Sequence, residues 1–343
     1  MKLSHFKQFA CGALFAAVAT SCTNSLPHKV DFYHWKTTYE VGSIAKEYMD
    51  KLQSETIYLH VFDIVKRNGE IIPEGKLLPF EHDSTLTQNF VPTIFITHSV
   101  FGNYNDDYEV LAGHILSLTN NIFFYNQLGS YNELQIDYDW TQMTRDNYFK
   151  FLRILAEKAE QYNYNGDNEP IKISCTIRLH QIKDVKEMGV PPVSKGYLMC
   201  YATSNPTDGM NSNSILDIEL LKNYTEHLEA YPLELDYALP LFSWGVVTNH
   251  LGKTKLINGL STADMSTDAF KKIGENKYEV VDDGFVHNLY LNKGFTVEIE
   301  EITPKLLSKA KSYLDEKLKG NYHIVYFQMS DGFLKRFTID DLK

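Results

Sequence analysis

The feature that most constrains the fold is an alternation of short apolar segments with stretches of helical periodicity along the whole chain. Short apolar runs bounded by turn residues predict buried strands, whereas apolar residues that recur every three or four positions predict helices. The expected strands are Val30–Trp35, Ile57–Val65, Val91–Phe101, Glu133–Trp140, Ile171–His180, Gly196–Ala202, Leu233–Trp244 and Tyr322–Met329. Helical patterns lie between most of them, at 41–52, 107–128, 144–162, 215–230 and 304–320. This alternation favours an α/β fold, a (β/α)₈ TIM barrel.

One segment interrupts the alternation. Residues 245–302, after the seventh expected strand, contain two short strand-forming runs separated by turn signals, at 278–284 and 294–300. Such runs predict antiparallel strands. We therefore expect residues 22–343 to form the barrel, with 245–302 as a small β-rich insertion over one of its faces.

The N-terminus has the order of charged, apolar and small residues that is typical of a secretory signal. Lys2 and Lys7 precede an apolar run at 9–18, and small residues come directly before Cys22. That ending resembles a bacterial lipobox, which implies a signal peptide at 1–21 and lipidation of Cys22. The alternative is a plain signal peptide with an incidental cysteine. The expected location is the bacterial cell envelope, in the periplasm or on the outer-membrane surface, with only acyl chains in the membrane.

Charge and motif content exclude several classes of protein. The chain has 33 Lys+Arg against 44 Asp+Glu and a formal net charge of −11, so nucleic acid is not an expected partner. No Cys/His cluster has the spacing of a zinc site, and no glycine-rich phosphate loop or dinucleotide fingerprint is present. We therefore expect no metal and no cofactor. Cys175 and Cys200 lie in apolar runs and are expected to be buried thiols. The alternative, in an oxidising compartment, is a disulfide between them.

The fourth expected strand is the most informative for function, because barrels of this kind build their sites at the carboxyl ends of the strands. Strand alternation places Asp137 and Asp139, together with Gln135 and Thr141, on the face that points into the barrel. Two carboxylates on one inward face repel each other and are costly to desolvate. The pair therefore indicates either a functional site or carboxylates that only bond to neighbours and shape the barrel.

The segment Gln135–Thr141 resembles the strand-four signature of chitinase-like, family 18 glycoside hydrolase barrels, which is Asp-x-x-Asp-x-Asp-x-Glu. Met199 and Tyr201 resemble the Met-x-Tyr-Asp segment of the sixth strand in the same family. The mature chain is also similar to a group of bacterial lipoproteins with glycoside hydrolase-like barrels. This resemblance implies a carbohydrate or glycan as the partner, and glycosidic bonds as the target of any catalysis.

The departures from the family pattern are specific. Asp137 and Asp139 match its last two aspartates, but Leu134 replaces the first aspartate and Thr141 stands where the proton-donating glutamate belongs. Ala202 replaces the aspartate of the sixth strand. Because a threonine hydroxyl cannot protonate a glycosidic oxygen, any hydrolysis must take its acid from elsewhere.

Other side chains are expected at the same mouth. Asp63 is the third catalytic candidate, because glycoside hydrolysis ordinarily needs two carboxyl groups ~5–5.5 Å or ~6.5–9.5 Å apart, and Asp63 or Asp331 could pair with Asp139. Arg178 would supply a counter-charge, and His180 is either a general acid or base or a hydrogen-bonded loop residue. The aromatic residues are either sugar-stacking or ordinary core residues. The substrate-binding candidates are Tyr33, Trp35, Arg178, His180, Tyr201, Trp244, Gln328 and Asp331.

Three functional hypotheses remain at this stage. The first is a lipid-anchored enzyme that hydrolyses glycosidic bonds with carboxylates at the barrel mouth. The second is a glycan-binding lipoprotein on a barrel that has lost catalysis. The third is a structural or assembly lipoprotein that uses the barrel as a scaffold, since a fold alone does not fix a function.

Overall fold

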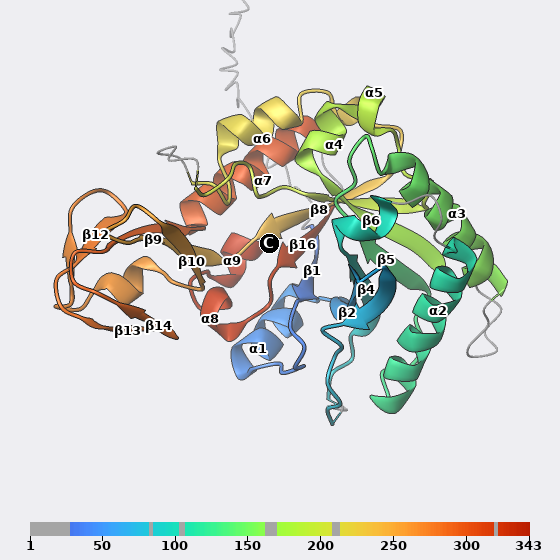
Figure 1. Cartoon of the computed structure of the whole chain (residues 1–343), viewed down its shortest axis with the longest axis horizontal. Coiled ribbons are helices and arrows are strands. Elements are labelled where there is room, and N and C mark those ends of the chain that lie inside the picture. The colour runs from blue at the N-terminus through green and yellow to red at the C-terminus, as the bar shows by residue number, and fades with distance from the viewer. Residues whose placement is uncertain (1–27, 82–84, 103–106, 162–169, 208–212, 319–321) are drawn as a thin grey trace, which may run out of the picture.

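The computed structural model describes residues 28–343 apart from 82–84, 103–106, 162–169, 208–212 and 319–321, so the expected signal peptide and Cys22 lie outside the described residues. Its centre is a closed ring of parallel strands, which confirms the expected (β/α)₈ barrel (Figure 1). β1 pairs with both β16 and β2, and these two pairings close the ring. The ring strands are β1 (Lys29–His34), β2 (Thr56–Arg67), β4 (Asn89–Ile96), β5 (Glu133–Asp137), β6 (Lys172–Arg178), β7 (Lys195–Met199), β8 (Leu235–Pro240) and β16 (His323–Phe327).

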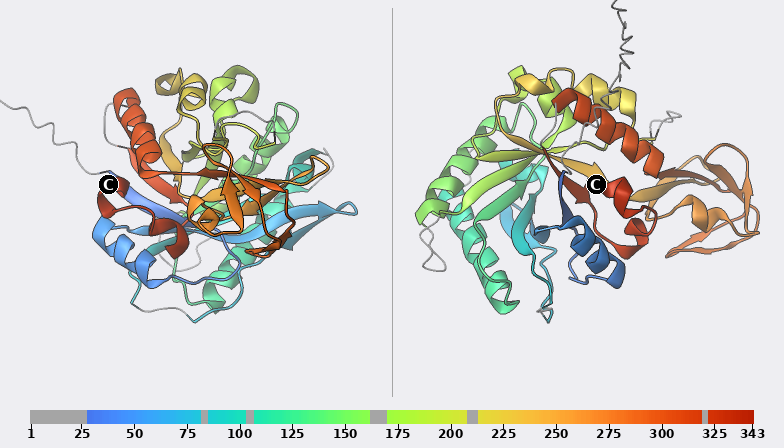
Figure 2. Two further views of the ribbon diagram at one scale, coloured as in Figure 1. Left: turned by 90° about the vertical axis from the view of Figure 1, so that its left-hand side faces the viewer. Right: turned by 180° about the vertical axis from the view of Figure 1, so that it is seen from behind.

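Helices cover the outside of the ring, as the two turned views show (Figure 2). Local sequence explains where several of them begin: the Asp107 carboxylate accepts from the backbone N–H groups of Glu109 and Val110, and Pro304 occupies the first position of α7. None of the helices in the described ranges is both long and apolar enough to cross a membrane. The helices are α1 (Ser43–Leu52), α2 (Tyr108–Tyr125), α3 (Arg145–Gln161), α4 (Leu179–Lys183), α5 (Val185–Met188), α6 (Ile218–Tyr224), α7 (Pro304–Leu318), α8 (Asp331–Leu334) and α9 (Ile339–Leu342), with 3₁₀ turns η1 (His98–Gly102), η2 (Leu228–Ala230) and η3 (Thr262–Met265).

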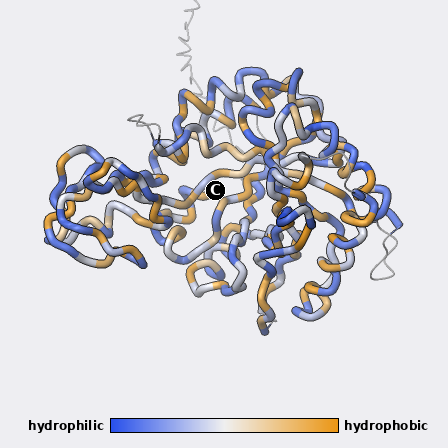
Figure 3. The backbone as a smooth tube through the Cα atoms, viewed as in Figure 1, coloured by the Kyte–Doolittle hydropathy of each residue, from blue (hydrophilic) through white to orange (hydrophobic). Residues whose placement is uncertain are grey.

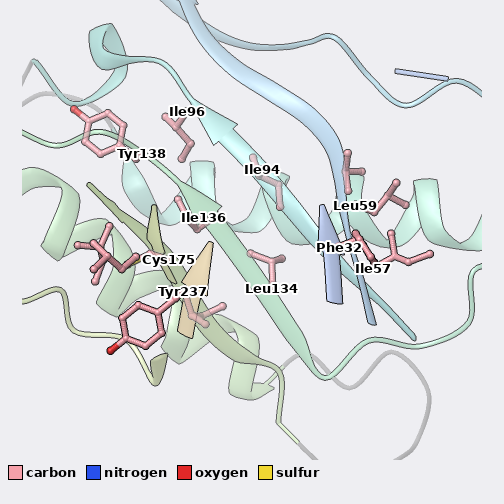
Figure 4. Packing of buried hydrophobic residues seen from close by; sticks show 14 of the residues in the cluster. Phe32, Ile57, Leu59, Ile94, Ile96, Leu134, Ile136, Tyr138, Cys175 and Tyr237 are labelled. Atoms are coloured by element: carbon pink, nitrogen blue, oxygen red, sulfur yellow. The ribbon is translucent and has the colours of Figure 1, made fainter. Parts of the chain in front are cut away.

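The strands bury side chains on both of their faces. Leu134 and Ile136 of β5 point outward into the large core between ring and helices (Figure 4). Along those helices hydrophobic and hydrophilic stretches alternate, as expected for elements with one buried side (Figure 3). Both Cys175 and Cys200 are buried free thiols and do not form a disulfide. A second, inner apolar cluster fills the ring itself and consists of Tyr33, Tyr58, Val91, Tyr197, Met199, Ala238 and Val325.

The expected β-rich insertion after the seventh strand is present as an antiparallel sheet with its own apolar core, beside the barrel in Figure 1. Its order is β10-β9-β15-β12-β11, and a separate two-stranded ribbon accompanies it. The sheet consists of β9 (Ser243–Thr248), β10 (Thr254–Asn258), β11 (Phe270–Lys272), β12 (Lys277–Val280) and β15 (Thr296–Glu301), and the ribbon of β13 (Gly284–Val286) and β14 (Leu289–Leu291).

Four ring strands end three or more residues earlier than expected. The seventh ring strand ends at Pro240 rather than at Trp244, because the chain leaves the barrel there and Ser243 begins β9, which pairs with β10 and β15. The third strand ends at Ile96, where the chain turns into η1, the fourth ends at Asp137, and the sixth ends at Met199 rather than at Ala202. Buried apolar or aromatic residues follow each of these ends within four positions, so hydrophobicity alone does not reveal where the strands end.

One strand of the barrel sheet was not expected. β3 (Glu70–Glu74) pairs antiparallel with the end of β2 and lies outside the ring. The two strands are joined through Asn68 and Gly69, whose φ angles of 52° and 86° are both in the left-handed region. Asn-Gly is the strongest short-range signal for a two-residue hairpin, so the sequence did contain the evidence for β3.

The inward side chains at the amino ends of the strands form a buried ionic cluster. The Nδ1 of His323 lies 2.9 Å from Oδ2 of Asp236, and its Nε2 lies 2.9 Å from Oδ2 of Asp31. Lys195 lies 2.7 Å from the same Asp236 oxygen. Burial alone would lower the pKa of His323, but the two carboxylates outweigh it and raise that pKa above its usual value. The cluster fills the closed end of the barrel, opposite the expected site.

Candidate functional site

A cavity of about 320 Å³ opens at the carboxyl ends of the ring strands, where a TIM barrel carries its site. The side chains come from the last two residues of several strands or from the residues that follow soon after them. Its volume falls within the range of small-molecule sites. The residues lining it are Tyr33, Trp35, Phe95, Asp137, Arg178, Met199, Tyr201, Ala202 and Phe327.

The charged part of this cavity is an ion pair between neighbouring strands. Nη2 of Arg178, at the end of β6, donates to Oδ1 of Asp137, at the end of β5, over 2.7 Å. The Thr176 hydroxyl donates to the same oxygen over 2.5 Å. The Asp137 side chain is 8% exposed and that of Arg178 is 24% exposed. Burial alone would lower the pKa of Arg178, but the Asp137 carboxylate raises it, so the guanidinium stays charged.

Below the ion pair, a neutral layer closes the cavity. The buried Tyr33 hydroxyl donates to Oε1 of Gln135 over 2.9 Å, and Thr93 lies 3.4 Å from the same oxygen. Burial holds the pKa of Tyr33 well above its usual value, so its hydroxyl remains a donor. Gln135 therefore points into the barrel as expected, but it supports the floor and does not line the cavity.

Aromatic rings form one wall of the cavity. The Phe327 ring lies between Trp35, at 5.6 Å with an edge-on orientation, and Tyr201, at 5.5 Å and 25° between the ring planes. The Tyr201 hydroxyl donates to the sulfur of Met199. Trp35 and Tyr201, both expected at the mouth, thus lie on the same wall, and Phe327 joins them.

Asp139 lies at the rim and not inside the cavity. Because β5 ends at Asp137, strand alternation no longer controls the direction of Asp139, and its side chain is 55% exposed. Nε2 of Gln181 donates to Oδ1 of Asp139 over 3.1 Å, and Nε2 of His180 lies 3.5 Å from that oxygen. Thr141 belongs to the turn before α3, where its carbonyl accepts from the backbone N–H of Arg145. The two strand-four carboxylates therefore occupy different environments.

Asp63 and Asp331 do not line the cavity. A bulge in β2 between His60 and Phe62 brings Asp63 beside His60, with 2.7 Å between Oδ1 and Nε2. The ring of His60 lies 4.9 Å from that of Trp35, so Asp63 lies behind the aromatic wall. Asp331 instead accepts from the backbone N–H of Ala45 and satisfies the first turn of α1.

Trp244 and Gln328 also lie outside the cavity lining. The indole N–H of Trp244 donates to Oε2 of Glu300 over 2.7 Å, and both residues belong to the insertion sheet. Its ring lies 5.3 Å from Phe242, which in turn lies 5.9 Å from Tyr201, so Trp244 extends the aromatic wall towards the insertion. Gln328 is half-buried directly after β16.

Several residues of the site were not among the sequence-based candidates, and Met199 and Ala202 were noted only as positions of the family motif. Phe95 and Phe327 line the cavity, and Gln181 holds Asp139. Phe95 follows Thr93 on the inward face of β4, and Phe327 follows Val325 on that of β16, so alternation applied to every strand would have found both. No sequence pattern indicates Gln181, because it lies in the short helix α4, and its contact with Asp139 joins two segments that are far apart in the sequence.

No protein-family model and no curated protein sequence matches this chain. Solved structures do match: the spore cortex-lytic enzyme SleL of Bacillus megaterium QM B1551, with a TM-score of 0.56 and 12% identity over 93% of this chain and 75% of that one. A chitinase from Chromobacterium violaceum ATCC 12472 matches with a TM-score of 0.53 and 11% identity, over 90% of this chain and 97% of that one. A GH18 chitinase from Cycas revoluta in complex with (GlcNAc)3 matches with a TM-score of 0.55 and 11% identity, over 92% of this chain and 97% of that one. The similar solved structures are thus chitinase-like and spore cortex-lytic barrels, and at these identities the likeness establishes the (β/α)₈ fold.

Proposed function

We propose that this chain binds a glycan in the cavity at the barrel mouth. The observation that carries the proposal is the combination, in one cavity, of an aromatic wall with the Asp137–Arg178 ion pair. Ring faces such as that of Trp35 pack against the C–H faces of sugar rings, while a carboxylate accepts from sugar hydroxyls and a guanidinium donates to sugar oxygens. Both polar groups are held by bonds within the protein, so little freedom is lost when a ligand arrives.

The comparisons support a carbohydrate as the ligand. One of the similar barrels is a GH18 chitinase in complex with (GlcNAc)3, and another is named a spore cortex-lytic enzyme. Chains that contain N-acetylglucosamine are therefore the first probes to use with this protein.

Hydrolysis of glycosidic bonds is the second candidate function, and the pairing at the rim favours it. Oδ1 of the accessible Asp139 lies 3.5 Å from Nε2 of His180, so a carboxylate and an imidazole, two groups that serve in general acid–base catalysis, lie side by side at the mouth. Against this, Asp137 is the sole carboxylate lining the cavity among the described residues, and it already forms an ion pair with Arg178. Because Thr141 cannot supply the acid, we rank binding first.

The test is a glycan array that carries bacterial, plant and animal oligosaccharides, including (GlcNAc)2 to (GlcNAc)6. Wild type is expected to bind a defined subset, and Trp35→Ala is expected to weaken that binding about tenfold or more, because it removes the ring that walls the cavity. Phe124→Ala is the matched control, since Phe124 is exposed on α2 and does not line the cavity. Equal binding by wild type and Trp35→Ala would contradict the proposed site.

The same glycans separate binding from hydrolysis when the products are followed by mass spectrometry. If the chain only binds, wild type and Asp139→Asn leave every glycan intact. If it hydrolyses, wild type releases shorter products, Asp139→Asn does not, and Thr141→Ala still does. Asparagine keeps the shape of the side chain and its bond from Gln181 but removes the charge. Products released at the wild-type rate by Asp139→Asn would exclude Asp139 as the catalytic carboxylate.

We also propose that the mature protein is a cell-envelope lipoprotein held by acyl chains on Cys22. The order of residues before Cys22 supports this location. When the full chain is expressed in a bacterium, Cys22→Ala is expected to lose labelling by a fatty-acid probe and to move from the membrane to the soluble fraction. A variant that stayed in the membrane fraction would point to a different anchor.

A further inference from the structure

The β-rich insertion has a cavity of its own, of about 240 Å³, lined entirely by residues of the insertion. Its titratable side chains are Asp264 of η3, Asp282 shortly before β13 and His287 just after it, and Thr267 adds a hydroxyl. Phe285, in the middle of β13, forms part of the same lining. The barrel-mouth site shares none of these residues.

Two large aromatic rings stand exposed next to this cavity. Phe285 and Tyr290 are direct partners across the β13–β14 ribbon, with 5.1 Å between their ring centroids. Phe285 is 75% exposed and Tyr290 is 47% exposed. Exposed apolar surface that is contiguous, rather than scattered singly, is typical of a binding surface. The paired rings therefore call for a ligand that packs on aromatic faces.

Asp264 supplies a fixed acceptor in the cavity. Its Oδ2 is occupied, because it accepts from the backbone N–H of Ser261 over 2.8 Å and from the Ser261 hydroxyl over 2.6 Å. The other oxygen, Oδ1, lies 3.7 Å from Nε2 of His287 and remains open to a ligand hydroxyl. Burial alone would raise the pKa of Asp264, but its bonds from Ser261 and the nearby His287 lower it, so the carboxylate is ionised at neutral pH.

We propose that this cavity, together with the Phe285–Tyr290 ribbon, is a second carbohydrate-binding site. The rings would pack on the C–H face of a sugar, Asp264 and Asp282 would accept from its hydroxyls, and His287 would bond to a further oxygen. This inference rests on the proposed function, because it takes the same class of ligand. It adds a site that neither the aromatic wall nor the Asp137–Arg178 pair contains.

The position of the insertion suits a glycan long enough to reach both sites. A Cβ placed on Gly259 would touch His287 and also Phe333 of α8. That helix follows directly after β16, whose last residue, Phe327, lines the barrel cavity. His287 therefore lies near α8, which follows the carboxyl end of β16, and glycans long enough to extend from the barrel mouth are the ligands that would gain from the second site.

The experiment uses the full chain and the same glycan array, extended to oligosaccharides of two to eight sugars. The variants are Phe285→Ala/Tyr290→Ala, Asp264→Asn and Trp35→Ala, with Leu251→Ala as the control for an exposed apolar residue of the insertion outside the cavity. The double variant is expected to bind the longest chains about tenfold more weakly and the shortest chains as wild type does. Asp264→Asn keeps an acceptor oxygen for Ser261, so the turn at Ser261 is expected to stay in place. The expected several-fold loss of glycan binding would therefore come from the missing negative charge. Thermal unfolding of each variant identifies any that is misfolded.

Two of the possible outcomes separate the two proposals. If Trp35→Ala loses all binding and the double variant binds every length as wild type does, the second site is wrong and the barrel site stands. If the double variant loses binding while Trp35→Ala keeps it, the second site stands and the barrel site is wrong. If wild type binds nothing on the array, both proposals fail together.

Discussion

Replacing Arg178 with alanine is expected to lower the free energy of unfolding by about 3–5 kcal/mol. The Asp137 carboxylate is 8% exposed, and Arg178 is its charged partner at 2.7 Å. Without the guanidinium, the carboxylate keeps the hydrogen bond from Thr176 but has to be buried with no counter-charge. The cost therefore comes from an unpaired buried charge and exceeds the worth of the lost contact itself. Urea unfolding at pH 7 measures it.

A double variant distinguishes this cause from a general loss of packing. Asp137→Asn/Arg178→Met removes both charges, keeps an acceptor for Thr176 and replaces the stem of the arginine with an apolar chain of similar length. It is expected to recover most of the stability lost in Arg178→Ala but to bind glycans more weakly than wild type, because neither charged group remains in the cavity. A cost of less than about 1 kcal/mol for Arg178→Ala would instead place the pair among ordinary surface ion pairs.

The fold could be predicted from the sequence because each ring strand is short, apolar and separated by a helical pattern or a turn. Period-two alternation also fixed the directions of residues within strands: Leu134 and Ile136 face the helices, while Gln135 and Asp137 face the interior. This reasoning ended where the strand ended. Asp139 lies beyond β5, and its position depends on Gln181, a contact between segments that no local pattern encodes.

The expected carboxylate partners of Asp139 show the same limit. Asp63 and Asp331 were placed at the mouth because they lie near or after the carboxyl ends of strands. In the folded chain Asp63 bonds to His60 across a bulge, and Asp331 bonds to the first turn of α1. Which of several nearby donors a carboxylate takes is decided by loop and helix placement, so proximity to a strand end is necessary for a site residue but not sufficient.

The second large effect on stability is expected for a substitution of Asp31, which lies at the opposite end of the barrel from Arg178. Asp31→Ala is expected to lower the free energy of unfolding by about 3–5 kcal/mol, because Asp31 is fully buried and is one of the two carboxylates that face His323. Its Oδ1 also accepts from the Ser54 hydroxyl and from the backbone N–H groups of Glu55 and Thr56. The alanine variant leaves all these donors without that acceptor. Asp31→Asn is the matched control, since it keeps an acceptor oxygen and is expected to lose less.

The cost of Asp31→Ala is expected to depend on pH with a definite sign. The pKa of His323 is raised in the folded state, so the stability from its protonated form is fully present below the unfolded pKa of about 6.5 and is lost as pH rises through the raised value. Asp236 and Lys195 remain beside the ring in the variant, so only the share due to Asp31 is removed. The difference in unfolding free energy between wild type and Asp31→Ala should therefore be larger at pH 6 than at pH 9. Urea unfolding at the two pH values measures it, with exposed His227→Gln as a control expected to show no such change. A difference that stayed constant, or grew towards pH 9, would show that Asp31 acts through its backbone bonds and not through His323.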